Sequence, residues 1–259
     1  MPSNRCIWCL LESTDSDREH IFPEALGCPD HLTLPGSVVC KSCNNGLAHL
    51  DRIVSDDFDF LTVMNGINRK KGRPAEVSSR GNVYASSTPD GPNIFFNLES
   101  SPRIAPTGQT INPFRGRPRD IKPDITTLGS GATTISFAVQ FGQHKKFARG
   151  LYKIALNSIA YMQGSETALH SRFDWIRRYV RKGGEARKIL LAAAPDTKYI
   201  LAAYPPWHDT DGEQAMELRI AMASFLLDLS ANEKHYEKIV EQAKIHFGEG
   251  NFSVMPPDA

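Results

Sequence analysis

Two Cys-x-x-Cys pairs near the N-terminus constrain the fold of this chain more than any other feature. Cys6 pairs with Cys9 and Cys40 pairs with Cys43, and 30 residues separate the two pairs. Each pair can form a knuckle, and four thiolates complete the tetrahedral shell that structural zinc prefers. The spacing therefore predicts a structural Zn²⁺ site that staples the first 55 or so residues. The fifth cysteine, Cys28, has no partner pair and is expected to be a small apolar residue.

The composition is that of an ordinary globular protein. Hydrophobic residues make up 41% of the 259 residues and charged residues 23%, and the formal net charge is +1. This near-neutral balance gives no global signal for nucleic acid, so any such signal must be local. The first residues lack an apolar signal region, and no apolar run approaches the roughly 18 residues of a membrane span. We therefore expect a cytoplasmic protein, whose reducing surroundings favour metal-bound cysteines over disulfides.

Hydrophobic periodicity and the cysteine spacing predict an α+β fold, in which a small zinc-stapled module precedes a larger mixed α+β domain. The expected boundaries are 1–60 for the module, 61–130 for an irregular, partly β connecting region, and 131–259 for the second domain. The expected strands are 37–39, 93–98, 133–141, 188–194, 199–204 and 216–229, and the expected helices are 41–55, 145–162, 171–182 and 232–247.

The residues around the cysteine pairs carry a second pattern. Glu19 and His20 lie between the pairs and are followed by an apolar pair and Pro23, and Asn44 comes directly after Cys43. This order resembles the HNH (ββα-metal) endonuclease superfamily, in particular its four-cysteine branch, as in phage recombination endonucleases that resolve branched DNA. The resemblance covers residues 6 to about 55. It implies a β-hairpin that carries the histidine, with a helix crossing beneath it.

The resemblance also implies catalytic roles. His20 would act as the general base, because an imidazole titrates near neutrality and can accept a proton from water. Glu19 and Asn44 would hold one divalent cation, Mg²⁺ or Mn²⁺, through oxygen ligands. The implied reaction is the hydrolysis of DNA phosphodiester bonds, with the cation stabilising the charge that develops at phosphorus.

Two positions depart from the family pattern. The middle position of the motif, often Asn or His, can be filled here only by His31 or Thr33. The late metal ligand of the family, where present, is a histidine at the position of Ala48. Asp51 lies seven residues after Asn44, on the same helix face, and is a candidate oxygen ligand. A solvated helix residue is an equally good interpretation of Asp51.

Four basic clusters suggest a DNA partner. Lys and Arg can neutralise phosphates, and interleaved Tyr or Phe can stack on bases. Solvated helix faces and loops are the competing interpretation of any single cluster. The clusters occupy residues 69–73, 115–119, 144–149 and 177–182.

Two other function classes remain open at this point. The first is a non-catalytic zinc-knuckle protein that binds nucleic acid, in which Glu19 and His20 are relics. The second is a nuclease effector, for example in phage defence, that a regulatory ligand or partner protein licenses through residues 131–259. The sequence does not choose among restriction, defence and recombination, nor does it give the oligomeric state.

Overall fold

The computed structural model describes residues 4–14, 18–68, 73–77, 81–117, 120–131, 133–136, 140–193, 198–205, 207–209 and 212–255. Side chains are not described at 207–209 and 212–214. The described residues form a mixed α+β structure with several small sheets, which confirms the predicted α+β class; the ββα-metal module stays a prediction. Two compact units divide the chain: one combines residues 1–55 with 144–259, and the other is 56–143. The predicted boundaries were 1–60, 61–130 and 131–259. In the structure the first and last of these regions belong largely to one unit, because the N-terminal residues pack against the C-terminal half.

An antiparallel sheet forms the centre of the first unit. Its strand order is β11-β13-β14-β10-β15, and β12 pairs with the far end of β13. Every residue of β14 is buried, which is the pattern of a strand covered on both faces. The strands are β10 (Ile189–Ala193), β11 (Ile200–Ala203), β12 (Trp207–Asp209), β13 (Gly212–Ala221), β14 (Ala223–Asp228) and β15 (Phe252–Val254).

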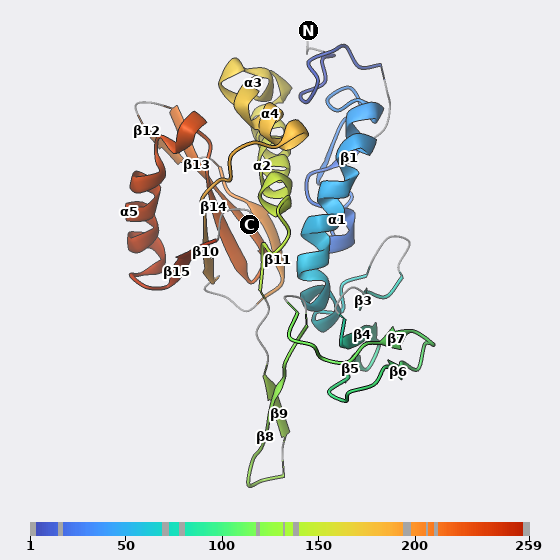
Figure 1. The fold of residues 1–259 in the computed structure, drawn as a ribbon. Helices are drawn as coiled ribbons and strands as arrows, with labels where there is room; N and C mark the ends of the chain where they lie inside the picture. Colours follow the sequence, from blue (N-terminus) through green and yellow to red (C-terminus); the bar gives the residue numbers. More distant parts are fainter. Residues whose placement is uncertain are drawn as a thin grey trace. The chain divides into compact units, whose positions relative to one another are not determined.

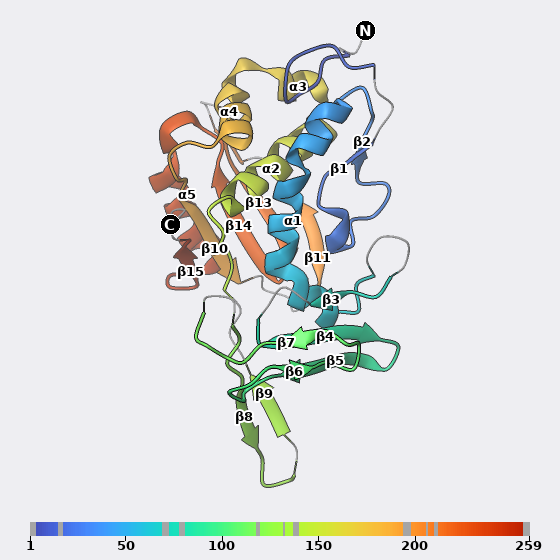
Figure 2. The same cartoon turned by 45° about the vertical axis from the view of Figure 1, so that its right-hand side comes forward.

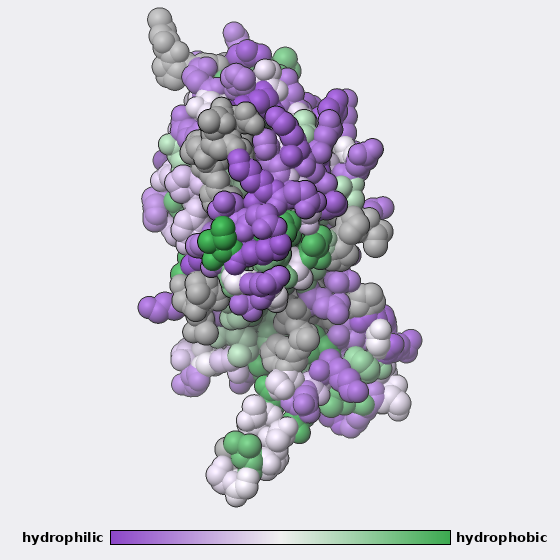
Figure 3. Space-filling model, turned by 90° about the vertical axis from the view of Figure 1, so that its left-hand side faces the viewer, coloured by the Kyte–Doolittle hydropathy of each residue, from purple (hydrophilic) through white to green (hydrophobic). Residues whose placement is uncertain are grey.

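Helix α5 (Tyr236–Phe247) covers one face of this sheet. Its buried residues Ile239 and Ala243 belong to one core cluster with Leu190 and Leu226 of the sheet. Gly248 ends the helix in a left-handed conformation that favours glycine (φ 87°). The outer side of α5 is polar except for the exposed Ile245, and Figure 3 shows a largely hydrophilic surface on the face that carries this helix.

Helix α2 (Phe147–Gln163) lies on the other face of the sheet (Figure 1). Phe147 packs on Phe225 of β14, and Tyr152 donates a hydrogen bond of 2.9 Å to the carbonyl of Asp228. All residues from Phe147 to Ala160 are buried, so α2 is enclosed on every side. The short helices α3 (Ser165–Leu169), η3 (Ser171–Phe173) and α4 (Asp174–Lys182) follow it, and η4 (Ala231–Glu233) follows the sheet strand β14.

The N-terminal residues supply the remaining cover of α2. A two-stranded hairpin pairs β1 (Glu19–His20) with β2 (Thr33–Leu34), and η1 (Glu24–Leu26) lies in its loop. Helix α1 (Lys41–Met64) follows, and Figure 2 shows the hairpin beside its N-terminal half. Gly150 of α2 faces α1 so closely that an added Cβ would lie 2.4 Å from Val54 Cγ2.

The described residues of the second unit form three small antiparallel sheets. Phe60 and Val63, from the last turns of α1, pack with Val77, Val83 and other apolar residues of this unit. The region 61–130, expected to be an irregular, partly β connection, lies within this unit and contributes residues to this core cluster. Its strands are β3 (Glu76–Val77), β4 (Val83–Thr88), β5 (Gly91–Phe96), β6 (Arg103–Ile104), β7 (Thr110–Ile111), β8 (Asp124–Thr127) and β9 (Thr133–Ser136).

Two predicted strands were wrong. Residues 37–39 form a turn, and the strand before the second cysteine pair is instead Thr33–Leu34. The expected strand 216–229 is a hairpin, because the chain reverses at Met222 between β13 and β14. Ala221 adopts a left-handed conformation there (φ 55°), and no Gly or Pro marks the turn in the sequence.

Candidate functional site

The four cysteines of the two pairs meet in one cluster. Their sulfur atoms all lie within 4.8 Å of one another, and no other group of three or more His, Cys, Asp or Glu ligands comes together among the described residues. Cys6 and Cys9 lie in an N-terminal turn, Cys40 precedes α1, and Cys43 lies in the first turn of that helix. Such a cluster can hold a structural metal ion such as zinc, as the spacing predicts.

The polar surroundings of Cys6 favour its thiolate. Backbone N–H groups of Trp8 and Cys40 each donate to Cys6 Sγ at 3.4 Å. A hydrogen bond from the Cys43 thiol, together with these backbone donors, outweighs burial and lowers the pKa of Cys6 to about 4. A thiolate is the form that binds metal. Cys28 stays outside the cluster, and burial raises the pKa of its thiol.

The hairpin next to this cluster presents Glu19 and His20 differently. Successive residues of a strand point to opposite faces. Glu19 is buried, with 3% of its surface exposed, whereas His20 is half-buried. The hairpin therefore leaves the imidazole partly accessible and directs the carboxylate inward.

The buried carboxylate of Glu19 meets a lysine from α2. Lys153 Nζ lies 2.6 Å from Glu19 Oε1, and it also donates to both carboxylate oxygens of Asp51, at 2.7 and 2.6 Å. The side chain of Lys153 is 2% exposed. Burial alone would lower the pKa of Lys153, but the carboxylates of Asp51 and Glu19 outweigh burial and raise it. The lysine is therefore held as an ammonium between two acids.

Asn157, one turn further along α2, completes this network. Its Nδ2 donates to Glu19 Oε1 at 3.1 Å and to the backbone carbonyl of His20 at 3.5 Å. Its Oδ1 is buried and has no hydrogen-bond partner among the described residues. One side chain thus contacts both residues of strand β1.

The predicted cation ligands Glu19, Asn44 and Asp51 are not assembled as an open cation site. Glu19 and Asp51 direct their carboxylates at Lys153, so their oxygens already have a cationic partner. Asn44 instead donates Nδ2 to the carbonyl of Arg18, at 3.3 Å. As arranged, the pair Glu19 and Asp51 does not fit Mg²⁺ or Mn²⁺, because a divalent ion there would have to displace the ammonium.

The structure also shows where the candidates for the middle position of the motif and for its late metal ligand lie. Thr33 lies directly opposite His20 in the hairpin register, whereas His31 is exposed in the loop before β2. Of the two candidates for the middle position, Thr33 is thus the one paired with the histidine. Ala48 is exposed, and His49 contacts the carbonyl of Gly46 within its own helix.

Sequence reasoning missed Lys153 and Asn157. Their only signal is a pair of polar residues four apart within a mostly apolar helix pattern. On an amphipathic helix such a pair would be assigned to the solvent side. Here α2 is enclosed, so both side chains must find polar partners inside the protein.

Two arginines of the basic clusters are buried and donate hydrogen bonds inside the protein. Arg177 is 4% exposed and donates to the carbonyls of Ile7 and Ala168 and to Asp174. Arg149 is also buried and donates to the carbonyl of Val180. These two side chains therefore have structural roles, while the prediction that the clusters contact DNA stays a prediction. Residues 69–72, 118 and 119 of the other clusters lie outside the described residues.

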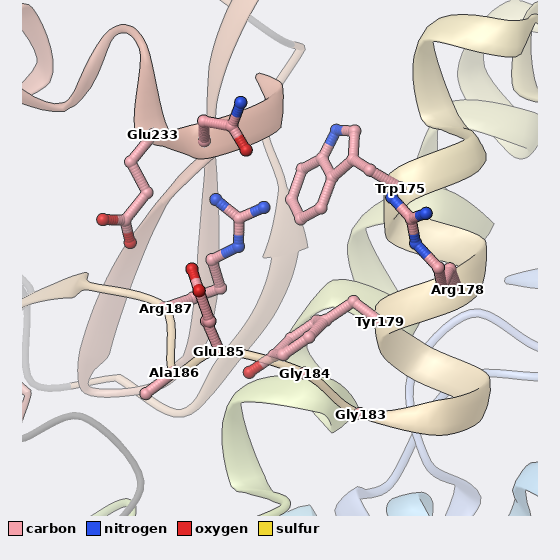
Figure 4. A pocket seen from close by; sticks show the side chains of 10 residues that line it. Trp175, Arg178, Tyr179, Gly183, Gly184, Glu185, Ala186, Arg187 and Glu233 are labelled. Carbon is pink, nitrogen blue, oxygen red and sulfur yellow. The ribbon is translucent and has the colours of Figure 1, made fainter.

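A separate pocket opens beside the C-terminal end of α4 (Figure 4). Its volume is about 470 Å³. The guanidinium of Arg187 lies 4.1 Å from the centroid of the Trp175 ring, and Arg178 and Tyr179 of α4 also line the wall. Glu185 and Glu233 balance the two arginines, so the pocket has no net charge of either sign.

The chain matches no protein-family model, and it has no significant match among curated proteins or solved structures. In the described part of the chain, no helix combines the length and apolar character that crossing a membrane requires.

Proposed function

We propose that this protein is an endonuclease of the HNH kind, which hydrolyses DNA phosphodiester bonds with His20 as the general base. The observation that carries the proposal is the placement of His20. It lies half-buried on a two-stranded hairpin, and the helix that begins at the four-cysteine cluster contacts this hairpin through Asn44 and Arg18. The cluster and the resemblance of residues 6 to 55 to HNH endonucleases support the same function.

The protein's own groups define what this site can do. The partly accessible imidazole of His20 can accept a proton from water. Its backbone is fixed by the pairing with Thr33 and by Asn157, so the ring is attached to a rigid support. The four-cysteine cluster, with zinc bound, would supply folding energy rather than chemistry, because all four ligands come from the protein and no coordination position stays open.

The experiment is a cleavage assay on supercoiled plasmid with Mg²⁺ or Mn²⁺, with and without EDTA. His20→Ala should lower the rate on the order of 10²–10⁴-fold, the usual contribution of a positioned acid–base group. Zinc content, melting temperature and DNA affinity should stay close to those of the parent protein, because the base acts in the transition state.

His31→Ala is the matched control, since it removes an exposed imidazole from the same hairpin. It should cleave like the parent protein. Equal cleavage by His20→Ala and the parent protein would overturn the proposed role of His20.

One observation favours a second candidate, the non-catalytic zinc-knuckle protein. Lys153 engages two of the three predicted cation ligands, Glu19 and Asp51. A protein of this class would bind DNA with the salt dependence of phosphate contacts. It would show no cleavage with any divalent ion, in contrast to the endonuclease.

A further inference from the structure

The strongest feature outside the expected chemistry is the buried ammonium of Lys153. An ammonium has three N–H donors and no acceptor. Three oxygens surround it at 2.6–2.7 Å: Glu19 Oε1, Asp51 Oδ1 and Asp51 Oδ2. Its hydrogen-bonding capacity can therefore be satisfied in full by the two carboxylates that the sequence assigned to a divalent cation.

We propose that Lys153 is the resident cation between Glu19 and Asp51 and that it excludes a divalent metal ion from this pair. The lysine holds both acids by charge, and the two carboxylates in turn keep the ammonium inside the protein. Glu19 is then a positioning residue that fixes strand β1, and through it His20, rather than a metal ligand.

The packing of α2 against α1 makes this arrangement lasting. At Gly150, one turn before Lys153, an added Cβ would also lie 3.2 Å from the backbone oxygen of Leu50, the residue before Asp51. Close to this contact, Lys153 of α2 reaches Asp51 of α1. Withdrawing the ammonium would leave two acids without their counter-ion, one of them almost fully buried, and this is strongly unfavourable.

The inference concerns the site of the proposed function, and its consequence for hydrolysis rests on that proposal. If His20 activates water, any divalent ion that assists must bind without Glu19 and Asp51. The exclusion itself can be tested without a cleavage assay, so the two proposals can fail separately.

The test measures Mn²⁺ binding to the zinc-loaded full chain by electron paramagnetic resonance, with melting temperature as a second readout. Asp51→Asn, made in the protein that still contains Lys153, should bind Mn²⁺ as the parent protein does, because Asp51 holds no metal ion while Lys153 is present. Lys153→Met should tighten Mn²⁺ binding by about tenfold or more, since two acidic ligands are released. Mn²⁺ should then raise the melting temperature of Lys153→Met but not that of the parent protein.

Two controls separate this effect from general charge and from misfolding. Lys145→Met removes one exposed positive charge just before α2 and should not change Mn²⁺ binding. Adding Glu19→Gln to Lys153→Met should abolish the gained affinity. A merely structural lysine would not produce a gain of metal affinity that depends on Glu19.

Each result decides for or against exclusion. The proposal is overturned if the parent protein binds Mn²⁺ and Asp51→Asn loses that binding. It is also overturned if Lys153→Met folds but binds Mn²⁺ no more tightly than the parent protein. If Lys153→Met folds only when Mn²⁺ is present, the ion has replaced the ammonium and the proposal is supported. If that variant never folds, the comparison of the parent protein with Asp51→Asn still decides the question.

Discussion

At the residue scale, a basic side chain in this protein is defined by its partners more than by its charge. Arg177 and Arg178 are neighbours on α4, yet Arg177 is buried and Arg178 is exposed. Arg177 Nε donates to the carbonyl of Ile7 at 2.7 Å, next to the first cysteine pair. Arg181 also donates to this segment, at the carbonyl of Trp8. Arg177 and Arg181 thus satisfy backbone carbonyls of the cysteine turn.

We therefore expect Arg177→Met to destabilise the protein by about 3 kcal/mol, because an unsatisfied buried polar group costs about 1–3 kcal/mol and more than one carbonyl loses its donor. Arg178→Met should change the free energy of unfolding by less than about 0.5 kcal/mol, as is usual for surface substitutions. Urea unfolding of both variants measures the difference. Equal midpoints would contradict the structural role of Arg177.

At the scale of elements, the contact between α1 and α2 sets the geometry of the candidate site. Asp51 lies on α1, whereas Lys153 and Asn157 lie on α2, so the distance between the two helices controls the ion network. Gly150 permits that distance because it has no Cβ. Leu50 and Val54 of α1 form the opposing surface.

Gly150→Ala should destabilise the protein by about 1–3 kcal/mol through overpacking, despite the better helix propensity of alanine. Gly46→Ala, on the exposed side of α1 with no atom within 4 Å of its added Cβ, should instead stabilise by about 0.5–1 kcal/mol. Thermal unfolding of the pair provides the measurement. A stabilised Gly150→Ala would show that the helices can separate without cost.

At the scale of the whole molecule, the cysteine module is part of a larger folding unit. Residues 1–55 and 144–259 form one compact unit. Side chains from residues 144–259 form an ion pair with Glu19 and donate hydrogen bonds to the carbonyls of Ile7 and Trp8. A module of this size has little core of its own, and here its polar groups also depend on partners more than 100 residues away.

A fragment of residues 1–60 should therefore stay without fixed tertiary structure even when stoichiometric Zn²⁺ is added, although its cysteines can bind the ion. The full chain should hold about one tightly bound zinc, and Cys43→Ser should lose it together with part of the thermal stability. Elemental analysis and NMR spectra of fragment and full chain test this. A well-dispersed spectrum of the zinc-loaded fragment would contradict it.

Local spacing was enough to predict some of these features and insufficient for others. The cysteine cluster follows from two short motifs, since each Cys-x-x-Cys pair brings its own sulfurs together. Helices α2, α4 and α5 also follow, because apolar residues recur with helical spacing along them, whereas α1 extends nine residues beyond the predicted end at residue 55. The turn at Met222 was missed because two apolar strands joined by a tight turn read as one long strand.

The sequence by itself determined which four cysteines form the cluster, the α+β class and the position of the Glu19–His20 pair between the cysteine motifs. Only the tertiary structure decided that Glu19 and Asp51 both form ion pairs with Lys153. The physical reason is that a buried charge is fixed by whichever opposite charge the packing brings within hydrogen-bonding distance. Lys153 is more than 100 residues away from both acids along the chain. It lies on helix α2, and no local sequence pattern reveals that this helix is enclosed on every side.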